Sequence, residues 1–433
     1  MTEIYSADWV VPVDDDPIEN GAVAVADGRI AAVATVDELG EGNRFDDAVI
    51  LPGFVNAHSH LEYAVYGGFG DGLAFGPWIR LHIERKSRIA WDEFLAIARL
   101  GAAESLRSGV TTVADASFSG AAAFAAAELG LRGIVGREVF GADPTQLDVI
   151  AADPVPETAG TNVVLGFAPH APYSVSADLY RAVYAENPPG RSVITHVAES
   201  DDELEYLLHG TGPIAEITEV APPGMTPVRY MASEGLLDAS LLAAHCVKID
   251  EEEIELLRAH DVAVAHCPRS NAILGCGIAP LAELVEAGLR VGLGTDSPAS
   301  TPSFDMFEEM RTAIYTARAR AQRPDALSAT EALRLATLGS ASALGLDDEI
   351  GSLAPGKRAD LAVVSLAGSP YLPWEDPAAS VVFGGSPDRV LLTVVAGEER
   401  YEKGGFAWLE LRRSAAAARA CMLSAEPLAH PKT

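Results

Sequence analysis

The chain contains few basic residues and few cysteines. Its 433 residues include 31 Lys and Arg against 62 Asp and Glu, so its net charge is −31. Because a surface of this sign repels nucleic-acid phosphates and anionic lipids, neither nucleic acid nor a membrane is an expected partner. The four cysteines have neither CxxC spacing nor the density of a disulfide scaffold. We therefore expect them to be free, buried thiols.

Long apolar runs are also absent from the sequence. The first five residues, Met1 to Tyr5, do not form a basic segment followed by an apolar core, and no later run is as long as a membrane span. We expect a cytoplasmic protein that acts on a small molecule, and a homo-oligomer is compatible with the sequence. A chain of this length is sufficient for one large domain and a smaller one.

Both ends of the chain have the pattern of short strands and turns. Residues 1–50 alternate apolar segments with turns such as Asp27-Gly28, and residues 346–410 contain apolar runs at Leu361 to Ser365 and Val390 to Val395. The simplest arrangement is a small β-sandwich built from both chain ends. The Ala-rich tail, 411–433, is expected to end in disorder.

Residues 51–345 alternate short apolar strands with amphipathic helices, which is typical of a parallel α/β architecture. The sequence contains no GxGxxG motif after the first of these strands, and polar residues follow many strands instead of one pair. These features favour a (β/α)8 TIM barrel over a doubly wound open sheet. The eight expected strands are Phe54 to Ala57, Thr111 to Ala116, Gly133 to Val139, Val163 to Ala168, Ser192 to Val197, Leu241 to Val247, Val262 to His266 and Arg290 to Gly294.

Four histidines and one aspartate stand at the C-terminal ends of these strands: His58, His60, His196, His245 and Asp296. His58 and His60 share one face of the first strand, because side chains in a strand alternate with period two. In a barrel, the C-terminal strand ends face one mouth, where distant residues converge. Three imidazoles and one carboxylate suit a divalent metal ion, most simply Zn(II), with Fe(II) or Co(II) as alternatives.

Other polar residues near the strand ends have two interpretations. Glu199, three residues after His196, is placed to reach a substrate at the metal, although the acidic first turn of a helix would also explain it, as for Asp201, Asp202 and Glu203. His170 follows the fourth strand and could line the mouth. His82 is expected to be a surface residue.

These residues resemble those of the amidohydrolase superfamily, in its metal-dependent deaminase and chlorohydrolase branch. The resemblance extends over nearly the whole chain, from Pro52-Gly53-Phe54-Val55-Asn56-Ala57-His58 through Gly294-Thr295-Asp296 to Gly351-Ser352-Leu353. It implies that His58, His60, His196 and Asp296 hold one metal, that His245 orients a water molecule and that Glu199 transfers protons. Relatives with two metals use a carboxylated lysine on the fourth strand, but this chain has no lysine between Lys86 and Lys248. A single metal ion is therefore expected.

Within this branch, the chain is similar to aminofutalosine deaminases of menaquinone biosynthesis and to S-adenosylhomocysteine and methylthioadenosine deaminases. The segments that carry the similarity are His58-Ser59-His60-Leu61-Glu62, Pro77-Trp78-Ile79, Pro169-His170-Ala171-Pro172-Tyr173-Ser174, His196-Val197-Ala198-Glu199 and Cys267-Pro268-Arg269-Ser270-Asn271. Glu62 and Ser297 favour the aminofutalosine side. The resemblance implies His170 as a substrate contact, with Glu62, Trp78 and Arg137 as further candidates; loop packing, or an ion pair between Arg137 and Glu138, explains these three equally well.

The expected reaction is the hydrolytic deamination of an aminopurine nucleoside, with release of ammonia. Rival reactions on the same site are cytosine or guanine deamination, dechlorination of a triazine, and hydrolysis of an imidazolone ring. A non-catalytic scaffold derived from the same fold is a third class. The scaffold interpretation is disfavoured because such relatives lose metal ligands, whereas all five strand-end residues are present here.

Overall fold

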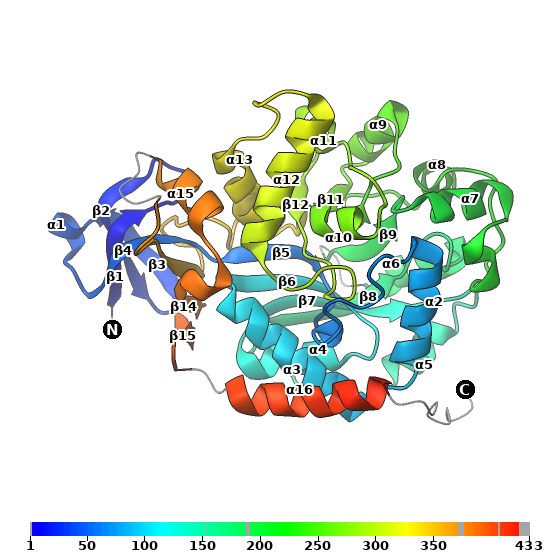
Figure 1. Ribbon diagram of the computed structural model, residues 1–433, viewed down its shortest axis with the longest axis horizontal. Coiled ribbons are helices and arrows are strands. Elements are labelled where there is room, and N and C mark those ends of the chain that lie inside the picture. Colours follow the sequence, from blue (N-terminus) through cyan, green and yellow to red (C-terminus); the bar gives the residue numbers. More distant parts are fainter. Residues whose placement is uncertain (1, 154, 188–190, 371–375, 406–407, 424–433) are drawn as a thin grey trace.

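The computed structural model describes residues 2–153, 155–187, 191–370, 376–405 and 408–423. Its centre is made of eight parallel strands, surrounded by helices (Figure 1). All eight were predicted from the apolar runs, with boundaries that differ by one or two residues. They are β5 (Phe54–Ser59), β6 (Val110–Ser117), β7 (Arg132–Val139), β8 (Val163–Pro169), β9 (Val193–Val197), β10 (Leu241–His245), β11 (Ala263–His266) and β12 (Val291–Leu293).

The eight strands form two four-stranded sheets, β5-β6-β7-β8 and β9-β10-β11-β12, whose edges adjoin. At one junction, the His196 amide donates to the His170 carbonyl across 2.9 Å. At the other, the Asp296 amide donates to the His58 carbonyl, also across 2.9 Å. The fold is therefore a TIM-barrel-like α/β arrangement, and both junctions lie at the candidate metal ligands.

The helices around the strands follow the 3.6-residue spacing of apolar side chains. In α3 (Trp91–Arg107), Phe94, Ile97, Ala98 and Leu106 are all buried, so one stripe of the helix faces the strands. The other helices are α2 (Phe75–Lys86), α4 (Ala121–Leu129), α5 (Gln146–Ala151), α6 (Ala177–Glu186), α7 (Asp201–His209), α8 (Pro227–Ser233), α9 (Glu251–Ala259), α10 (Pro268–Ile273), α11 (Leu281–Glu286), α12 (Met306–Ala321), α13 (Ala329–Arg334), α14 (Ser340–Ala343) and α15 (Pro377–Gly384). Among them, α2 was not singled out from the sequence.

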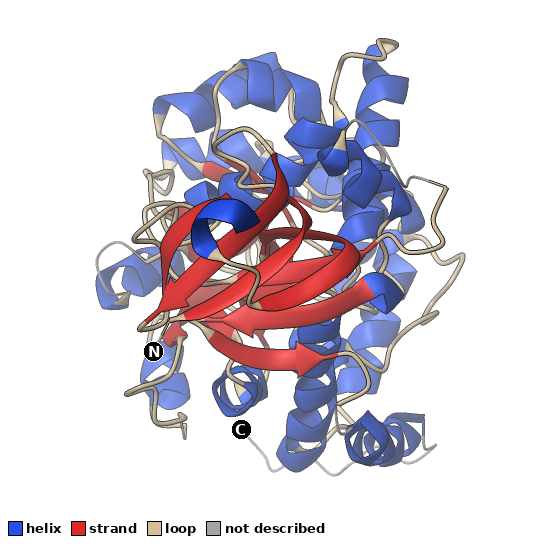
Figure 2. Ribbon diagram, turned by 90° about the vertical axis from the view of Figure 1, so that its left-hand side faces the viewer, coloured by secondary structure: helices blue, strands red, loops and turns tan. Residues whose placement is uncertain are grey.

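Strands from both chain ends meet outside the barrel, as expected, but they form one hydrogen-bonded sheet of seven strands. The order is β15-β14-β13-β4-β1-β2-β3, and β4 pairs with β1 on one side and β13 on the other. The strands of the sheet are twisted relative to one another (Figure 2). Buried side chains of these strands form one hydrophobic core. The strands are β1 (Glu3–Val10), β2 (Ile18–Ala26), β3 (Arg29–Thr35), β4 (Asn43–Pro52), β13 (Leu361–Ser365), β14 (Val390–Val395) and β15 (Glu398–Glu402).

The first part of the C-terminal tail belongs to a helix. Helix α16 (Trp408–Leu423) lies along α3, and its Ala415, Ala418 and Met422 are buried (Figure 1). Small side chains at this spacing let the two helices approach closely. Residues 424–433, where the tail was expected to end in disorder, lie outside the described residues. In the described part of the chain, none of the helices has the length and apolar character needed to cross a membrane.

Candidate active site

Three of the predicted histidines converge at the C-terminal ends of the strands. His58, His60 and His196 each offer a ring nitrogen, and these three atoms lie within 4.8 Å of one another. The Asp296 Oδ1 atom lies 3.6 Å from the Nε2 atom of His58 and 3.4 Å from that of His60. Residues far apart in the sequence therefore form one compact cluster of three imidazoles and a carboxylate.

Asp296 reaches this cluster because β12 ends unusually close to β5. A Cβ atom at Gly294 would lie 2.7 Å from the His58 Cβ atom, so only glycine allows this approach. Asn56 then clamps the two segments: it accepts from the Thr295 amide at 2.9 Å and donates to the Thr295 hydroxyl at 2.7 Å. The Gly294-Thr295-Asp296 motif thus has a structural role in addition to supplying a carboxylate.

The imidazoles are oriented by backbone carbonyls and are held neutral. His60 Nδ1 donates to the Ala116 carbonyl and His196 Nδ1 to the His170 carbonyl, each at 2.7 Å, which leaves both Nε2 atoms free as ligands. Burial lowers the pKa of all three imidazoles, that of His60 to about 3. Neither ring nitrogen of the fully buried His58 has a hydrogen-bond partner among the described residues. A buried, unpartnered, neutral imidazole fits a divalent cation.

Glu199, His245 and Asp296 form a second cluster that shares the Asp296 carboxylate with the first. His245 Nε2 lies 3.7 Å from Glu199 Oε1, while its Nδ1 contacts Asn271 Oδ1 at 3.0 Å. Burial, reinforced by the charge of Asp296, raises the pKa of Glu199 well above its usual range. This shift favours the protonated carboxyl group, which is the form that a general acid requires.

Two residues of α10, Ser270 and Asn271, support this cluster, although no role was expected for them from the sequence. Ser270 donates to Asp296 Oδ2 at 2.6 Å, and Asn271 orients His245. Ser300 adds a further hydrogen bond to Asp296 Oδ2, at 2.7 Å. The sequence feature that could have identified Ser270 and Asn271 is the Cys267-Pro268-Arg269-Ser270-Asn271 segment. This segment contributed to the family resemblance, but no function was predicted for its residues.

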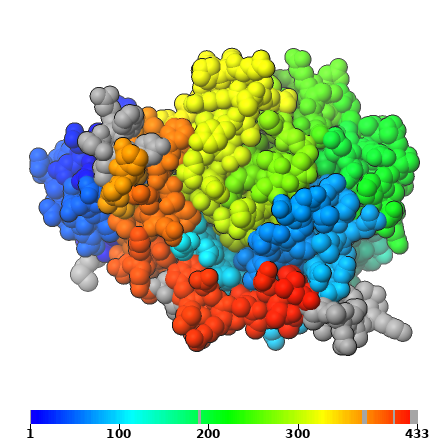
Figure 3. Space-filling view, viewed as in Figure 1, coloured from blue at the N-terminus to red at the C-terminus, as the bar shows by residue number. Residues whose placement is uncertain are grey.

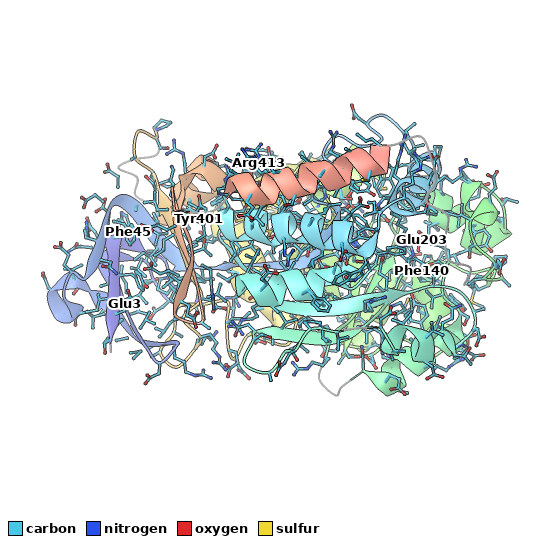
Figure 4. All side chains as sticks on the ribbon, turned by 90° about the horizontal axis from the view of Figure 1, so that it is seen from below. Glu3, Phe45, Phe140, Glu203, Tyr401 and Arg413 are labelled. Atoms are coloured by element: carbon cyan, nitrogen blue, oxygen red, sulfur yellow. The ribbon has the colours of Figure 1, made fainter. Side chains whose placement is uncertain are left out.

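Glu203 proves to be a buried support for Glu199, so its expected role as a solvated helix cap is wrong. Its carboxylate accepts from the amides of Ala198, at 3.1 Å, and Glu199, at 2.7 Å. These bonds stabilise a turn in which Ala198 has a φ of 53°, a conformation that non-glycine residues rarely adopt. The turn directs Glu199 toward His245. Figure 4 labels Glu203 and Phe140 in the barrel, far from Glu3 and Phe45 in the end sheet.

The two clusters open into a cavity of about 40 Å³ whose outer wall is helix α2. His170 and Trp78 line this cavity, as does Ser297. The Trp78 indole is fixed by a 3.1 Å hydrogen bond from its Nε1 to the Ala299 carbonyl. Since small-molecule pockets usually measure about 300 to 1,000 Å³, the cavity must widen to accept a substrate larger than a few waters. In the space-filling view, the region of α2 lies at the molecular surface beside α16 (Figure 3).

Two predicted substrate contacts lie outside the cavity. Glu62 is buried and accepts hydrogen bonds from Ser117, from Ser119 and from the Ala122 amide at the start of α4. Arg137 points to the other side of β7 and forms an ion pair with Asp153 at 2.8 Å. Glu62 therefore has the alternative role considered for it, which is to hold the packing of a loop. Arg137 forms an ion pair as the alternative proposed, but with Asp153 instead of Glu138.

We expect Glu62→Ala to act on stability and not on substrate affinity. The variant leaves several buried donors without an acceptor, which should cost about 2 to 4 kcal/mol of unfolding free energy. Urea unfolding checks this, with Glu62→Gln as the control because the amide oxygen still accepts. A raised KM with an unchanged urea midpoint would identify Glu62 as a substrate contact instead.

Two cavity residues were missed because α2 was not predicted. His82 is 6% exposed and lines the cavity, so the expectation of a surface histidine is wrong. Its ring packs against Tyr63, Tyr66 and Trp78. Lys86, one turn further along α2, also lines the cavity. Glu138, which the sequence analysis considered only as an ion-pair partner of Arg137, lies in the cavity wall within reach of His170 and His196.

Comparisons with known proteins identify relatives that match most of the chain. The model of the amidohydrolase family matches residues 49–400. A 5-methylthioadenosine/S-adenosylhomocysteine deaminase from Pelotomaculum thermopropionicum is 35% identical over 90% of each chain. A 5'-deoxyadenosine deaminase from Methanothermobacter thermautotrophicus is 33% identical over 86% of this chain and 87% of its own. Among solved structures, a zinc-bound adenosine deaminase from Xanthomonas campestris superimposes with a TM-score of 0.82 at 30% identity, covering 97% of this chain and 98% of its own.

Proposed function

Because the chain belongs to the amidohydrolase family, we propose that it hydrolytically deaminates a 6-aminopurine nucleoside and releases ammonia. The observation that carries this proposal is the shared Asp296 carboxylate, which joins the three-histidine cluster to the Glu199 and His245 pair inside one cavity. Deamination of an aromatic ring needs both an activated water and a proton donor, and the two clusters supply these side by side.

We propose that His58, His60, His196 and Asp296 hold the divalent cation, and that it is a single Zn(II), with Fe(II) as the alternative. Three neutral imidazoles and one carboxylate are nitrogen and oxygen donors of the kind that would hold Zn(II). The zinc-bound adenosine deaminase supports this choice of metal. The absence of a lysine on β8 supports a single ion, because nothing there can carry the bridging carbamate.

The cation, when bound, lowers the pKa of water from about 15.7 to about 7 and so makes a nucleophile available at neutral pH. His245 is fixed by Asn271 and orients the attacking oxygen toward the ring carbon that bears the amine. Glu199 donates a proton to the adjacent ring nitrogen, and its carboxylate then passes the proton from the water to the departing amine. Water and the amine are thereby converted into a ring carbonyl and ammonia.

The proposed substrate class rests on the relatives. We propose a purine nucleoside with a modified 5' position: S-adenosylhomocysteine, methylthioadenosine or aminodeoxyfutalosine. The residue-level argument for aminodeoxyfutalosine used Glu62 and Ser297; only Ser297 lines the cavity. We also propose that residues 51–345 form the catalytic unit, with 1–50 and 346–410 as its supporting end unit and 411–433 as a tail.

We expect these three nucleosides to be deaminated at least ~100-fold more efficiently than adenine, cytosine or guanine. Contacts with the ribose and its 5' substituent position the reacting carbon, so a free base should lose kcat as well as affinity. Ammonia release, measured as kcat/KM for all six compounds, tests this. Preference for a free base, or chloride release from a chlorotriazine that exceeds every deamination rate, would contradict the nucleoside assignment.

A further inference from the structure

We propose that Lys86 is a specificity-determining residue that binds a carboxylate on the 5' substituent of the nucleoside. This assignment rests on the proposed nucleoside deamination and adds to it the chemical class of the remote substituent. It separates substrates such as S-adenosylhomocysteine, which carry a carboxylate, from methylthioadenosine, which carries none.

Lys86 is the one lysine or arginine among the described residues that line the cavity. It belongs to the last turn of α2, one turn after His82, so it occupies the same wall that Phe75, Trp78 and Ile79 form nearer the start of the helix. A negatively charged group entering this cavity therefore meets a single side-chain cation, in a protein with a net charge of −31.

The ammonium group of Lys86 rests on two aromatic rings. Its Nζ atom lies 4.0 Å from the ring centroid of Phe118 and 5.1 Å from that of Phe140. Such cation–π contacts hold a charge in place and replace part of its lost hydration. They also leave the ammonium N–H donors available, because an aromatic face does not accept them as strongly as an oxygen does.

No carboxylate among the described residues forms an ion pair with Lys86 within 4.0 Å, and no hydrogen bond of its ammonium occurs there. Lys248 offers a contrast, because it contacts Asp201 at 2.7 Å. Burial lowers the pKa of Lys86, while the more distant Glu138 and Glu62 raise it. A partly dehydrated cation without an oxygen partner is costly, and a substrate carboxylate would supply that partner through charge-assisted hydrogen bonds.

The negative charge of Glu138 restricts where a substrate carboxylate can bind in the cavity. It is 5% exposed, lines the same cavity and lies near His170 and His196, on the side of the metal cluster. A substrate carboxylate placed there would be repelled, whereas one placed over the Phe118 and Phe140 rings would be attracted by Lys86. The rival role for Lys86 is to balance the charge of Glu138, which would affect every substrate equally.

The test compares three thioether nucleosides in the metal-replete enzyme: S-adenosylhomocysteine, its decarboxylated amine S-adenosyl-3-thiopropylamine, and methylthioadenosine. The variants are Lys86→Met, Lys86→Gln and Lys86→Arg, with Lys248→Met as the matched control because Lys248 lies outside the cavity lining. Aminodeoxyfutalosine serves as a second carboxylate-bearing substrate with an aromatic substituent. Ammonia release gives kcat/KM for each pair.

We expect Lys86→Met and Lys86→Gln to lower kcat/KM for the two carboxylate-bearing substrates by about 10- to 100-fold, mainly through KM, the usual range for one charge-assisted hydrogen bond. The rates for methylthioadenosine and the decarboxylated amine should change by less than about 3-fold. Lys86→Arg should retain most of the preference because it keeps the charge. Lys248→Met should behave as wild type.

An equal loss on all substrates, or no loss on any, would overturn the assignment, since the first indicates a structural role and the second no contact. These outcomes leave nucleoside deamination intact. A wild-type enzyme that deaminates none of the nucleosides would contradict the proposed function itself, and the Lys86 assignment with it. Lys86→Gln and Lys86→Arg keep the question decidable if Lys86→Met does not fold.

Discussion

His196→Ala is expected to lose most of the bound divalent cation and all measurable deaminase activity. The substitution removes one of the four proposed ligands, and His58, His60 and Asp296 are placed for a four-ligand site, so the variant should hold the cation less tightly. It also removes a ring that stacks on His60, so the remaining ligands lose part of their orientation. Alanine offers no ligand atom in place of the imidazole, so repacking of the neighbouring side chains should not restore metal binding.

Elemental analysis of the metal-replete protein, before and after desalting, measures this effect without depending on activity. Wild type should retain about one equivalent per chain, and His196→Ala well below that. His209→Ala is the matched control, because His209 is an exposed histidine at the end of α7. A variant that keeps a full equivalent would show that His196 is not a ligand, and a reproducible value of two in wild type would contradict the single-ion proposal.

The barrel strands and the metal cluster could be predicted because their physical causes are local. Each strand is a short apolar run, and each ligand stands at the C-terminal end of its run, where a parallel arrangement brings such ends together. The prediction that His58 and His60 lie on the same face required only the two-residue period of a strand. Asp296 required the eighth strand to adjoin the first, and the Gly294 contact with His58 is the feature that brings it there.

The cavity wall could not be predicted, because its causes are not local. The segment before α2 contains Gly67, Gly68, Gly70 and Gly72, which favour a loop, and α2 mixes polar and apolar residues without a clear stripe. Phe75 and Trp78 of α2 are buried where they line the cavity, whereas Ile83 is exposed. Because this helix was not predicted, Lys86 was not recognised as a cavity residue and His82 was wrongly expected at the surface.

The orientation of individual side chains also could not be predicted from the sequence. Arg137 and Glu138 are adjacent on β7 and point to opposite faces of the sheet. Arg137, which was expected to contact substrate, forms an ion pair with Asp153 outside the cavity, whereas Glu138 lines the cavity. Glu62 follows the metal pair directly, yet its buried oxygens accept hydrogen bonds from the start of α4. Only the packing of β6 and α4 against this turn decides that outcome.

Glu199→Gln is expected to retain the metal and the fold but to lose turnover by at least ~100-fold, the usual scale for removing a positioned general acid or base. Glutamine has nearly the same shape, so the Glu203 hydrogen bonds to the Ala198 and Glu199 amides should persist. The change removes the carboxyl group that the mechanism uses to transfer one proton to the ring nitrogen and a second proton from the water to the departing amine. The loss should therefore fall on kcat, with a smaller change in KM.

Steady-state kinetics and metal content of the same preparation test this prediction together, and Glu205→Gln, an exposed position in α7, is the matched control. Because burial and Asp296 raise the pKa of Glu199, wild-type activity should decline as pH rises through that pKa and the proton is lost. Glu199→Gln should lack this decline, since its amide does not titrate. Near wild-type turnover in the variant would reduce Glu199 to a helix-start carboxylate, and the neighbouring Glu138, which faces the same cavity, would become the next proton donor to test.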